Sequence, residues 1–170
     1  MKARMAAVVG MCGFVMSSFA NADWITTTQD DIFSGGKTAM MLGYISPFQS
    51  VAIDCNSDGL SLALLQKEKW QDGRPSSAWN LLVKVDGGEV HRFIASSGQR
   101  NTEYVQYITF EKDEIFKVLA ELRNAKSQIL LGLQSEEFNA KWSGTAPVSG
   151  STRETDKFIQ ACKLKGAQPQ

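Results

Sequence analysis

The stretch STRETDKFIQACKLKG, residues 151–166, has the pattern of a short amphipathic helix with a cysteine near its end. Ser151 and Glu154 have the spacing of a capping box, so we expect the helix to begin at this serine. Phe158 and Cys162 are four residues apart and therefore share one helix face, with Ile159 beside them. An apolar face of this kind packs against the rest of a fold. The pattern thus predicts a helix that presents Cys162 to a sheet.

The cysteine content predicts one disulfide. The chain has three cysteines, and Cys12 lies in an N-terminal segment that we expect to be removed. Cys55 and Cys162 remain, and an even number of cysteines in an exported chain indicates pairing. Closing a loop of about 107 residues stabilises a fold by roughly 4.7 kcal/mol in the chain-entropy model. The alternatives are two unpaired buried thiols or a catalytic thiol. A catalytic thiol is disfavoured because it needs a nearby base, and the sequence has only one histidine that could serve.

Residues 1–22 have the organisation of a secretory signal peptide. Lys2 and Arg4 precede an apolar run over residues 5–19, and an A-x-A cleavage pattern ends at Ala22. The alternative is a transmembrane anchor. It is disfavoured because the run is shorter than the roughly 20 apolar residues that span a bilayer. We therefore expect cleavage after Ala22, a periplasmic mature chain and no stable membrane insertion.

The charge balance does not point to a nucleic-acid partner. The chain has 18 basic and 18 acidic residues, and removal of Lys2 and Arg4 leaves an acidic excess of two. Such a balance favours neither nucleic acid nor an anionic membrane surface. The remaining length fits one domain, which we place at residues 23–166, followed by a flexible tail at residues 167–170.

Most of the mature chain has the alternation of apolar and polar residues that is typical of β-strands. In QSVAIDC, residues 49–55, the side chains of Val51, Ile53 and Cys55 share one face, which places the cysteine inward. Gly87-Gly88 between two such runs predicts a tight hairpin. We expect strands at residues 38–45, 49–55, 60–65, 80–86, 89–96, 104–110, 127–133 and 137–142.

A second segment has a helical period. The apolar residues of segment 112–126 occur at i, i+3, i+4 and i+7: Ile115, Val118, Leu119 and Leu122. Acidic residues at its start and basic residues at its end complement the helix dipole. We expect a loop over residues 143–150. Together these features predict a mainly β (α+β) fold, an antiparallel β-sandwich-like domain with two helices and one disulfide.

The pattern of polar residues indicates no catalytic or metal-binding set. His91 is the one histidine and lies on a predicted strand, where a hydrogen-bonded or solvated side chain is the expected role. The sequence contains no nucleophile-elbow motif, and one histidine with two oxidised cysteines leaves too few ligands for zinc. Asp30-Asp31 is interpreted as a polar turn, with a calcium site as the weaker alternative. We therefore predict no catalytic residues, no metal and no cofactor.

The segment KEKWQDGRPSSAWN, residues 67–80, is the strongest candidate for partner binding. Trp70 and Trp79 bracket a loop with Asp72 and Arg74, and tryptophan and arginine are enriched at binding hot spots. The alternative is that both rings pack beneath the loop at the edge of the core. The predicted partner-binding residues are Trp70, Asp72, Arg74 and Trp79.

The order of these features resembles a group of exported proteins. Trp24 lies near the mature N-terminus, the strand VAIDC ends at Cys55, the strand VKVD ends at Asp86, and the helix segment FIQAC ends at Cys162. This order is similar to that of small periplasmic accessory proteins associated with type VI secretion, and of related uncharacterised exported β proteins. The resemblance implies a disulfide-bonded, β-sandwich-like module without catalytic residues.

We expect a non-catalytic periplasmic binding module with a protein partner in the cell envelope, acting as an accessory factor of type VI secretion or of the envelope. The alternative is an inhibitor or immunity protein against an envelope-targeted toxin, with the tryptophan-containing loop inserted into the toxin's active site. A hydrolase is a weaker third alternative, because no nucleophile–base pair is evident in the sequence. The sequence does not indicate the oligomeric state.

Overall fold

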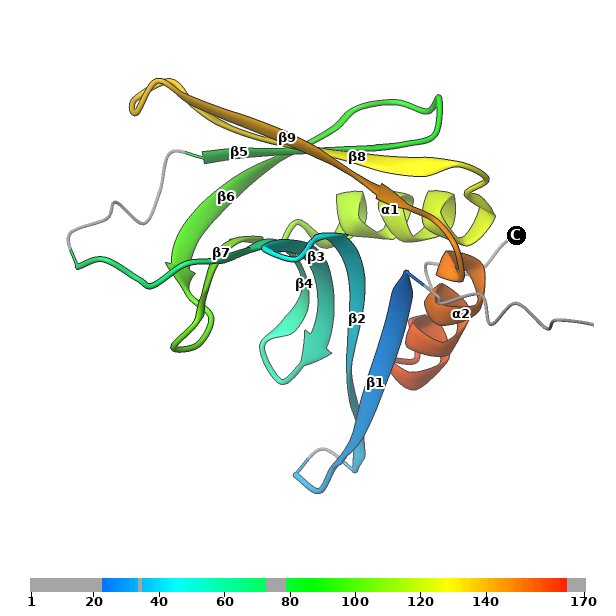
Figure 1. Cartoon of the computed structure of the whole chain (residues 1–170). Coiled ribbons are helices and arrows are strands. Elements are labelled where there is room, and N and C mark those ends of the chain that lie inside the picture. The colour runs from blue at the N-terminus through cyan, green and yellow to red at the C-terminus, as the bar shows by residue number, and fades with distance from the viewer. Residues whose placement is uncertain (1–22, 34, 73–78, 165–170) are drawn as a thin grey trace, which may run out of the picture.

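The computed structural model describes residues 23–33, 35–72 and 79–164. The predicted signal peptide and the predicted tail at 167–170 lie outside these residues. Within the described part the chain forms nine strands and two helices (Figure 1): β1 (Trp24–Asp31), β2 (Gly36–Ser46), β3 (Gln49–Asn56), β4 (Gly59–Lys67), β5 (Trp79–Val85), β6 (His91–Gln99), β7 (Tyr104–Thr109), α1 (Lys112–Asn124), β8 (Gln128–Ser135), β9 (Ala140–Pro147) and α2 (Ser151–Ala161).

The described strands form one antiparallel sheet in the order β1-β2-β3-β4-β7-β6-β5-β8-β9. The sheet curls, so that β5, β8 and β9 face β2, β3 and β4 across the interior (Figure 1). Its two ends meet where Trp24 Nε1 donates to the carbonyl oxygen of Pro147 at 2.8 Å. Nearby, the N–H of Asp23 donates to the carbonyl oxygen of Ser149 at 3.1 Å. The predicted mainly β, antiparallel fold with two helices is confirmed.

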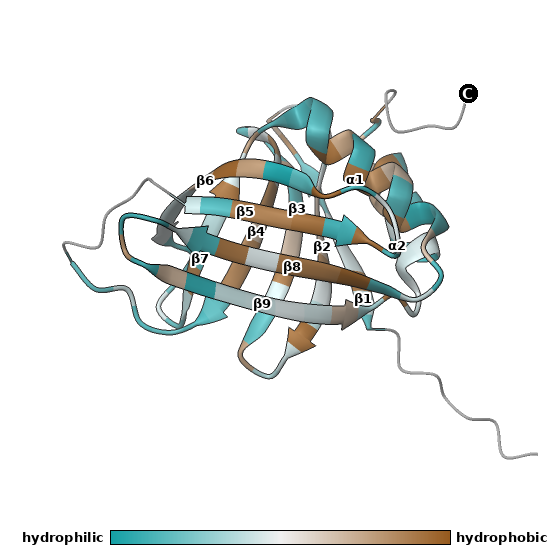
Figure 2. Ribbon diagram, turned by 90° about the horizontal axis from the view of Figure 1, so that it is seen from above, coloured by the Kyte–Doolittle hydropathy of each residue, from teal (hydrophilic) through white to brown (hydrophobic). Residues whose placement is uncertain are grey.

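The core lies inside the curl of the sheet. Every second residue of β5, β6 and β8 is buried, as expected for strands with one face on a core. Strands β3 and β4 are buried on both faces, because the small side chains of Ala52 and Ala63 on the outer face pack with Leu42, Tyr104 and Ile108. Figure 2 shows hydrophobic residues concentrated along β5 and β8, whereas both helices combine hydrophobic and hydrophilic positions.

Strand β1 begins with a tryptophan that is 1% exposed. The ring of Trp24 lies over its cross-strand partner Gly43 on β2, where an added Cβ would come within 2.6 Å of the ring. Farther along β1, Asp30 pairs with Lys37 and Asp31 pairs with Gly36. The interpretation of Asp30-Asp31 as a turn was therefore wrong, because the pairing with β2 continues to the last residue of β1.

Helix α1 confirms the helical pattern in segment 112–126. The four residues chosen from their spacing are all buried: Ile115, Val118, Leu119 and Leu122. Its first turn carries Asp113 and Glu114, and its last turn carries Arg123, which agrees with the expected dipole complement. The helix packs against the inner face of the sheet and against α2.

The expected capping box of α2 is wrong. The N-cap is Gly150, whose φ of 83° favours glycine, and no side chain caps the helix. Ser151 is instead the first helical residue and donates through Oγ to the carbonyl oxygen of Leu122 on α1 at 3.0 Å. Glu154 is turned toward β1. Both side chains satisfy buried backbone groups of other elements, and a local pattern of four residues does not contain that information.

Two connections also differ from the sequence prediction. The segment 143–150, expected to be a loop, continues β9 as far as Pro147, because it pairs with β8 from Ala140 onward. The connection between β5 and β6 spans residues 86–90 and is longer than the predicted tight hairpin. Asp86 has a φ of 50°, and its carboxylate accepts the backbone N–H groups of residues 126–128, which holds this turn against the start of β8.

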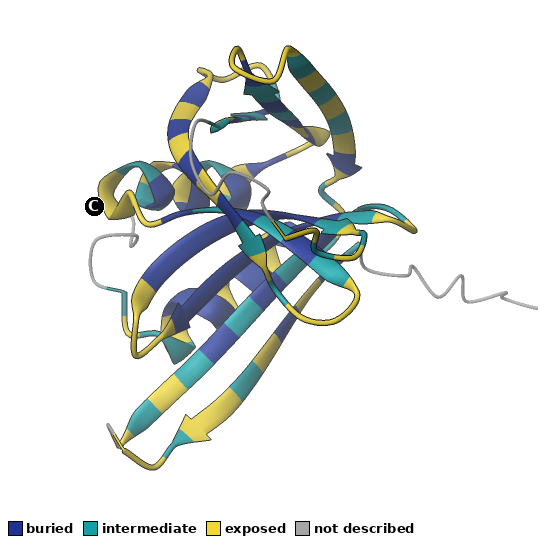
Figure 3. Ribbon diagram, turned by 90° about the vertical axis from the view of Figure 1, so that its left-hand side faces the viewer, coloured by how far each residue is buried: buried dark blue, intermediate teal, exposed yellow. Residues whose placement is uncertain are grey.

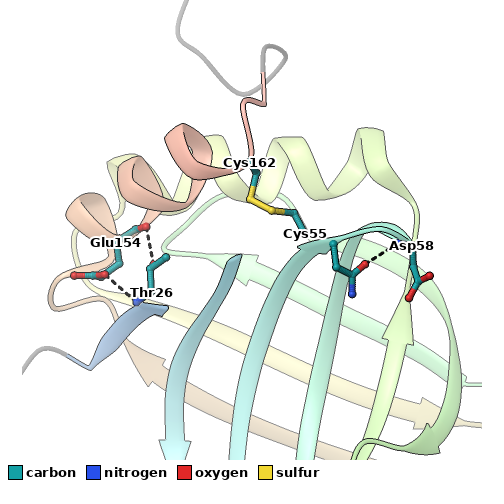
Figure 4. Close-up of a disulfide and its surroundings, with 6 residues drawn as sticks. Thr26, Cys55, Asp58, Glu154 and Cys162 are labelled. Carbon is teal, nitrogen blue, oxygen red and sulfur yellow. Dashed lines mark hydrogen bonds between the residues drawn. A yellow bond between two sulfur atoms is a disulfide. The ribbon is translucent and has the colours of Figure 1, made fainter. Parts of the chain in front are cut away.

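The disulfide between Cys55 and Cys162 is confirmed. Their Cα atoms lie 6.2 Å apart, and the bond joins the end of β3 to the C-cap of α2 across 107 residues of sequence (Figure 4). Cys55 is 8% exposed and belongs to the core, whereas Cys162 is half-buried at its edge. The disulfide therefore attaches the last helix to the end of β3, the third strand in the sheet order.

Candidate binding surfaces

Trp79 lies at the first position of β5 and is the centre of a group of aromatic rings. Its ring is stacked with that of Phe138 at a centroid distance of 5.6 Å and an interplanar angle of 30°. It meets Tyr107 edge-on, at 4.8 Å and 66°. We call Trp79, Tyr107 and Phe138 the aromatic cluster. Such offset and edge-to-face pairs add about 0.5–1.5 kcal/mol beyond the burial of their area.

The aromatic cluster is partly accessible. Tyr107 is 4% exposed, whereas Phe138 is 37% exposed and lies in the turn between β8 and β9. Trp79 is half-buried, and its Nε1 is buried without a hydrogen-bond partner among the described residues. Sequence reasoning did not place Phe138 beside Trp79, because the two residues are far apart in the chain and meet through the pairing of β5 with β8.

The other residues of the predicted partner-binding segment occupy different environments. Trp70 is half-buried and packs against the core, and Asp72 is exposed. Arg74 lies outside the described residues. Both tryptophans therefore contact the edge of the core, and at least Trp79 does so beside an exposed ring. The binding role of Trp70, Asp72, Arg74 and Trp79 stays a prediction.

His91 lies between the carboxylates of Glu114 and Glu121 on α1. It is 4% exposed, with Nδ1 2.5 Å from Glu114 Oε1 and Nε2 3.1 Å from Glu121 Oε2. Burial lowers the pKa of His91, but the hydrogen bond with Glu114 and the charges of both glutamates outweigh it and raise the pKa above its ordinary value. The pKa of Glu114 is lowered by its bonds to Lys117 and to His91. This arrangement fixes α1 to the first residue of β6.

A second ion pair lies on the outer face of the sheet. Arg100 binds Asp54 with two hydrogen bonds, Nη1 to Oδ2 and Nη2 to Oδ1, both 2.9 Å long. The side chain of Asp54 is 9% exposed and that of Arg100 is 26% exposed. The paired geometry joins the connection after β6 to the C-terminal part of β3.

The free edge of β1 is covered in part by α2 (Figure 4). The carboxylate of Glu154 accepts the backbone N–H of Thr26 at 2.9 Å, and the carbonyl oxygen of Glu154 accepts Thr26 Oγ1 at 2.9 Å. The ammonium of Lys157 donates to the carbonyl oxygen of Thr26. Side chains of a helix thus bind the backbone groups that an adjacent strand would bind.

The described residues contain no group of three or more His, Cys, Asp or Glu side chains arranged to hold a metal ion. None of the helices in the described part of the chain combines the length and the apolar composition that a membrane span requires.

No protein-family model matches the chain, and a search of curated proteins found no match. Among solved structures, the chain is similar to the crystal structure of invasion associated protein B from Bartonella henselae. The TM-score is 0.51 and the sequence identity 15%, over 84% of this chain and 94% of the other. At this identity the similarity concerns the fold, a mainly β domain of comparable length.

Proposed function

We propose that this protein is a non-catalytic periplasmic binding module that engages a protein partner of the cell envelope. Its predicted role is that of an accessory factor of type VI secretion or of the envelope, as the resemblance of the sequence implies. The partner contacts the aromatic cluster and the adjacent segment that begins at Trp70.

The observation that carries this proposal is the stacking of Trp79 on the exposed ring of Phe138. Tyr107 contacts Trp79 edge-on, so the Trp79 ring is held in place before any partner arrives. A pre-positioned aromatic surface loses little conformational entropy on binding, and tryptophan and tyrosine are enriched at energetic hot spots.

Two features support the proposed location. The disulfide between Cys55 and Cys162 belongs to an oxidising compartment. Residues 1–22 have the pattern of an export signal, which is removed in such a compartment. Together these features favour the periplasm as the place where the partner is met.

The proposal is tested by affinity capture from an envelope extract with the oxidised protein as bait. Phe138→Ala removes the exposed ring of the aromatic cluster, and Trp79→Phe replaces the indole on which Phe138 stacks with a smaller ring. Ile94→Ala is the matched control, because Ile94 is 78% exposed on β6 and lies outside the cluster. We expect the unmodified protein to capture a stoichiometric partner. The affinity of this partner for the Phe138→Ala protein should be lower by about tenfold or more, and its affinity for the Ile94→Ala control should be unchanged.

Equal capture by all three variants would contradict a binding role of the aromatic cluster. The identity of the captured protein separates the two functional alternatives. A secretion or envelope component supports the accessory role, and a toxin supports the role of an inhibitor.

A further inference from the structure

Strand β1 has an unpaired side. It is the first strand of the sheet, and its eight residues all pair with β2 on the other side. In an antiparallel pair, the N–H and C=O groups of every second residue point away from the partner strand. Thr26 shows which residues these are, since its N–H and C=O bind α2. The backbone groups of Thr28 and Asp30 therefore point in the same outward direction.

Helix α2 covers the beginning of this edge and leaves the rest open. The helix lies beside β1, and the hairpin of β1 and β2 extends beyond the end of the helix (Figure 1). Figure 3 shows burial giving way to exposure toward the tip of this hairpin. No other described residue forms a hydrogen bond with the outward backbone groups of Thr28 and Asp30. These two residues thus provide two donors and two acceptors.

The open part of the edge faces a cleft. The cleft has a volume of about 430 Å³ and is bounded by the hairpin on one side and the C-terminal half of α2 on the other. We call it the edge cleft. Six of its lining residues carry polar or charged side chains: Thr28, Asp30, Lys37, Lys157, Gln160 and Lys163.

The lining of the edge cleft is positively charged. It contains three lysines and one carboxylate. Lys37 binds Asp30 at 2.6 Å, which neutralises that carboxylate, and Lys157 reaches the carbonyl oxygen of Thr26. The excess of two positive charges favours an occupant that carries carboxylates.

We propose that an extended acidic segment of a partner protein adds to β1 as a further strand, in the edge cleft, by pairing with Thr28 and Asp30. Outward backbone groups repeat along β1 at every second residue, a spacing of roughly 6.6 Å. An extended backbone matches this repeat, and its side chains on one face meet the lysines. Strand addition of this kind takes affinity from main-chain hydrogen bonds and specificity from the side chains. This site is separate from the aromatic cluster and does not depend on it.

The proposal is tested by amide hydrogen exchange, followed by NMR on the full chain with its disulfide intact. The probe is the capped peptide Thr-Glu-Val-Glu-Val-Glu-Thr, and its counterpart with lysine in place of glutamate is the charge control. We expect the acidic peptide to slow exchange of the Thr28 and Asp30 amides by about tenfold or more. The amide of Thr26 is bound to Glu154 already and should change little.

Two pairs of variants separate backbone pairing from other modes of binding. Thr28→Pro removes the outward N–H without removing a ladder bond to β2, whereas Thr28→Ala keeps it. We expect binding to be lost in the first and retained in the second. Lys163→Glu should weaken binding, and Lys141→Glu on β9, at a position that does not line the edge cleft, should not. Failure of Thr28→Pro to fold would leave the lysine pair and the exchange pattern as independent readouts.

Several outcomes would overturn the proposal. They are equal protection by the lysine peptide, full binding by a folded Thr28→Pro variant, or no protection at peptide concentrations on the order of 1 mM. Protection that appears only in a chain ending at Leu164 would assign the edge cleft to the chain's own residues 165–170 and also overturn it. None of these results bears on capture through Phe138, so the two proposals fail independently.

Discussion

Glu154 on the last helix holds Thr26 on the first strand through two hydrogen bonds, each 2.9 Å long. The carboxylate accepts the backbone N–H of Thr26, and the carbonyl oxygen of Glu154 accepts its hydroxyl. The two residues are 128 positions apart in the chain and both are buried. An edge strand with unpaired backbone groups is prone to association with other chains. Here the edge is covered at Thr26 and open from Thr28 onward.

Replacing Glu154 with Ala should destabilise the fold by roughly 1–3 kcal/mol, because the buried N–H of Thr26 loses its acceptor. Glu154→Gln keeps an acceptor oxygen at the same position and should cost less. Urea unfolding of the two variants measures the difference. Arg153→Gln is the control, since Arg153 binds the same carboxylate from an exposed position. Equal loss in the Ala and Gln variants would contradict the role of the hydrogen bond.

The contribution of Glu154 should depend on pH. Burial raises the pKa of its carboxyl, but hydrogen bonds from Arg153 and from the N–H of Thr26 outweigh this and hold the pKa below its ordinary value of 4.5. Stability from the ionised group is therefore present above pH 4.5 and is lost as the pH falls through the lowered pKa. In Glu154→Gln, stability should fall less over that acidic range. An unchanged acid limb of the stability profile would disprove this.

The disulfide should contribute a large part of the stability. The bond closes a loop of 107 residues, and the chain-entropy model assigns roughly 4.7 kcal/mol to a loop of this length. We expect the double variant Cys55→Ser/Cys162→Ser to unfold at a much lower urea concentration than the oxidised protein. Reduction of the unmodified protein is the matching experiment. The prediction is wrong if the double variant and the oxidised protein unfold at the same midpoint.

His91 should stabilise the protein most strongly in acid. Its pKa is raised, so the stability that it contributes is complete below pH 6.5 and is lost as the pH rises through the raised value. We expect His91→Gln to lower the free energy of unfolding by about 1.5 kcal/mol below that pH. This value is at the low end for interactions with charged groups, because both glutamates are partly exposed and solvent weakens the attraction.

The penalty of His91→Gln should shrink as the pH rises well above neutrality, since the imidazole of the unmodified protein is then neutral too. Chemical denaturation at several pH values gives the comparison, and Glu89→Gln, at an exposed position in the connection before β6, is the control. A penalty independent of pH would mean that His91 acts by packing alone.

The pair of Arg100 and Asp54 should be coupled. Removing the guanidinium by Arg100→Leu leaves a carboxylate that is 9% exposed without its partner, which should cost about 1–3 kcal/mol. Asp54→Asn removes the opposite charge and should cost less. A double-mutant cycle measures the interaction energy between the two side chains. Strictly additive losses would show that the two hydrogen bonds do not contribute to stability.

The elements that sequence reasoning predicted correctly are those whose information lies in neighbouring residues. The spacing of Ile115, Val118, Leu119 and Leu122 suffices for α1, because a helix places residues three and four apart on one face whatever surrounds it. The alternation in residues 49–55 places Cys55 inward for the same kind of reason. The local pattern gave a wrong prediction where a side chain binds a residue of another element. Ser151 and Glu154 have the spacing of a capping box, but they bind α1 and β1 instead.

The candidate sites divide in the same way. Residue type alone marked Trp70 and Trp79, but the stacking of Trp79 on Phe138 depends on the pairing of β5 with β8. The edge cleft has no signal in the sequence, because Thr28 and Lys163 lie in unremarkable polar segments that meet when α2 packs beside β1.

By itself, the sequence determined that this chain is a mainly β domain with two helices and a bond between Cys55 and Cys162. Hydrophobic periodicity and the number of cysteines suffice for those conclusions. Only the tertiary structure decided which strand lies at the edge, how far α2 covers it, and that the backbone of Thr28 and Asp30 faces a positively charged cleft. These features arise from contacts between residues more than a hundred positions apart, and periodicity along the chain does not encode them.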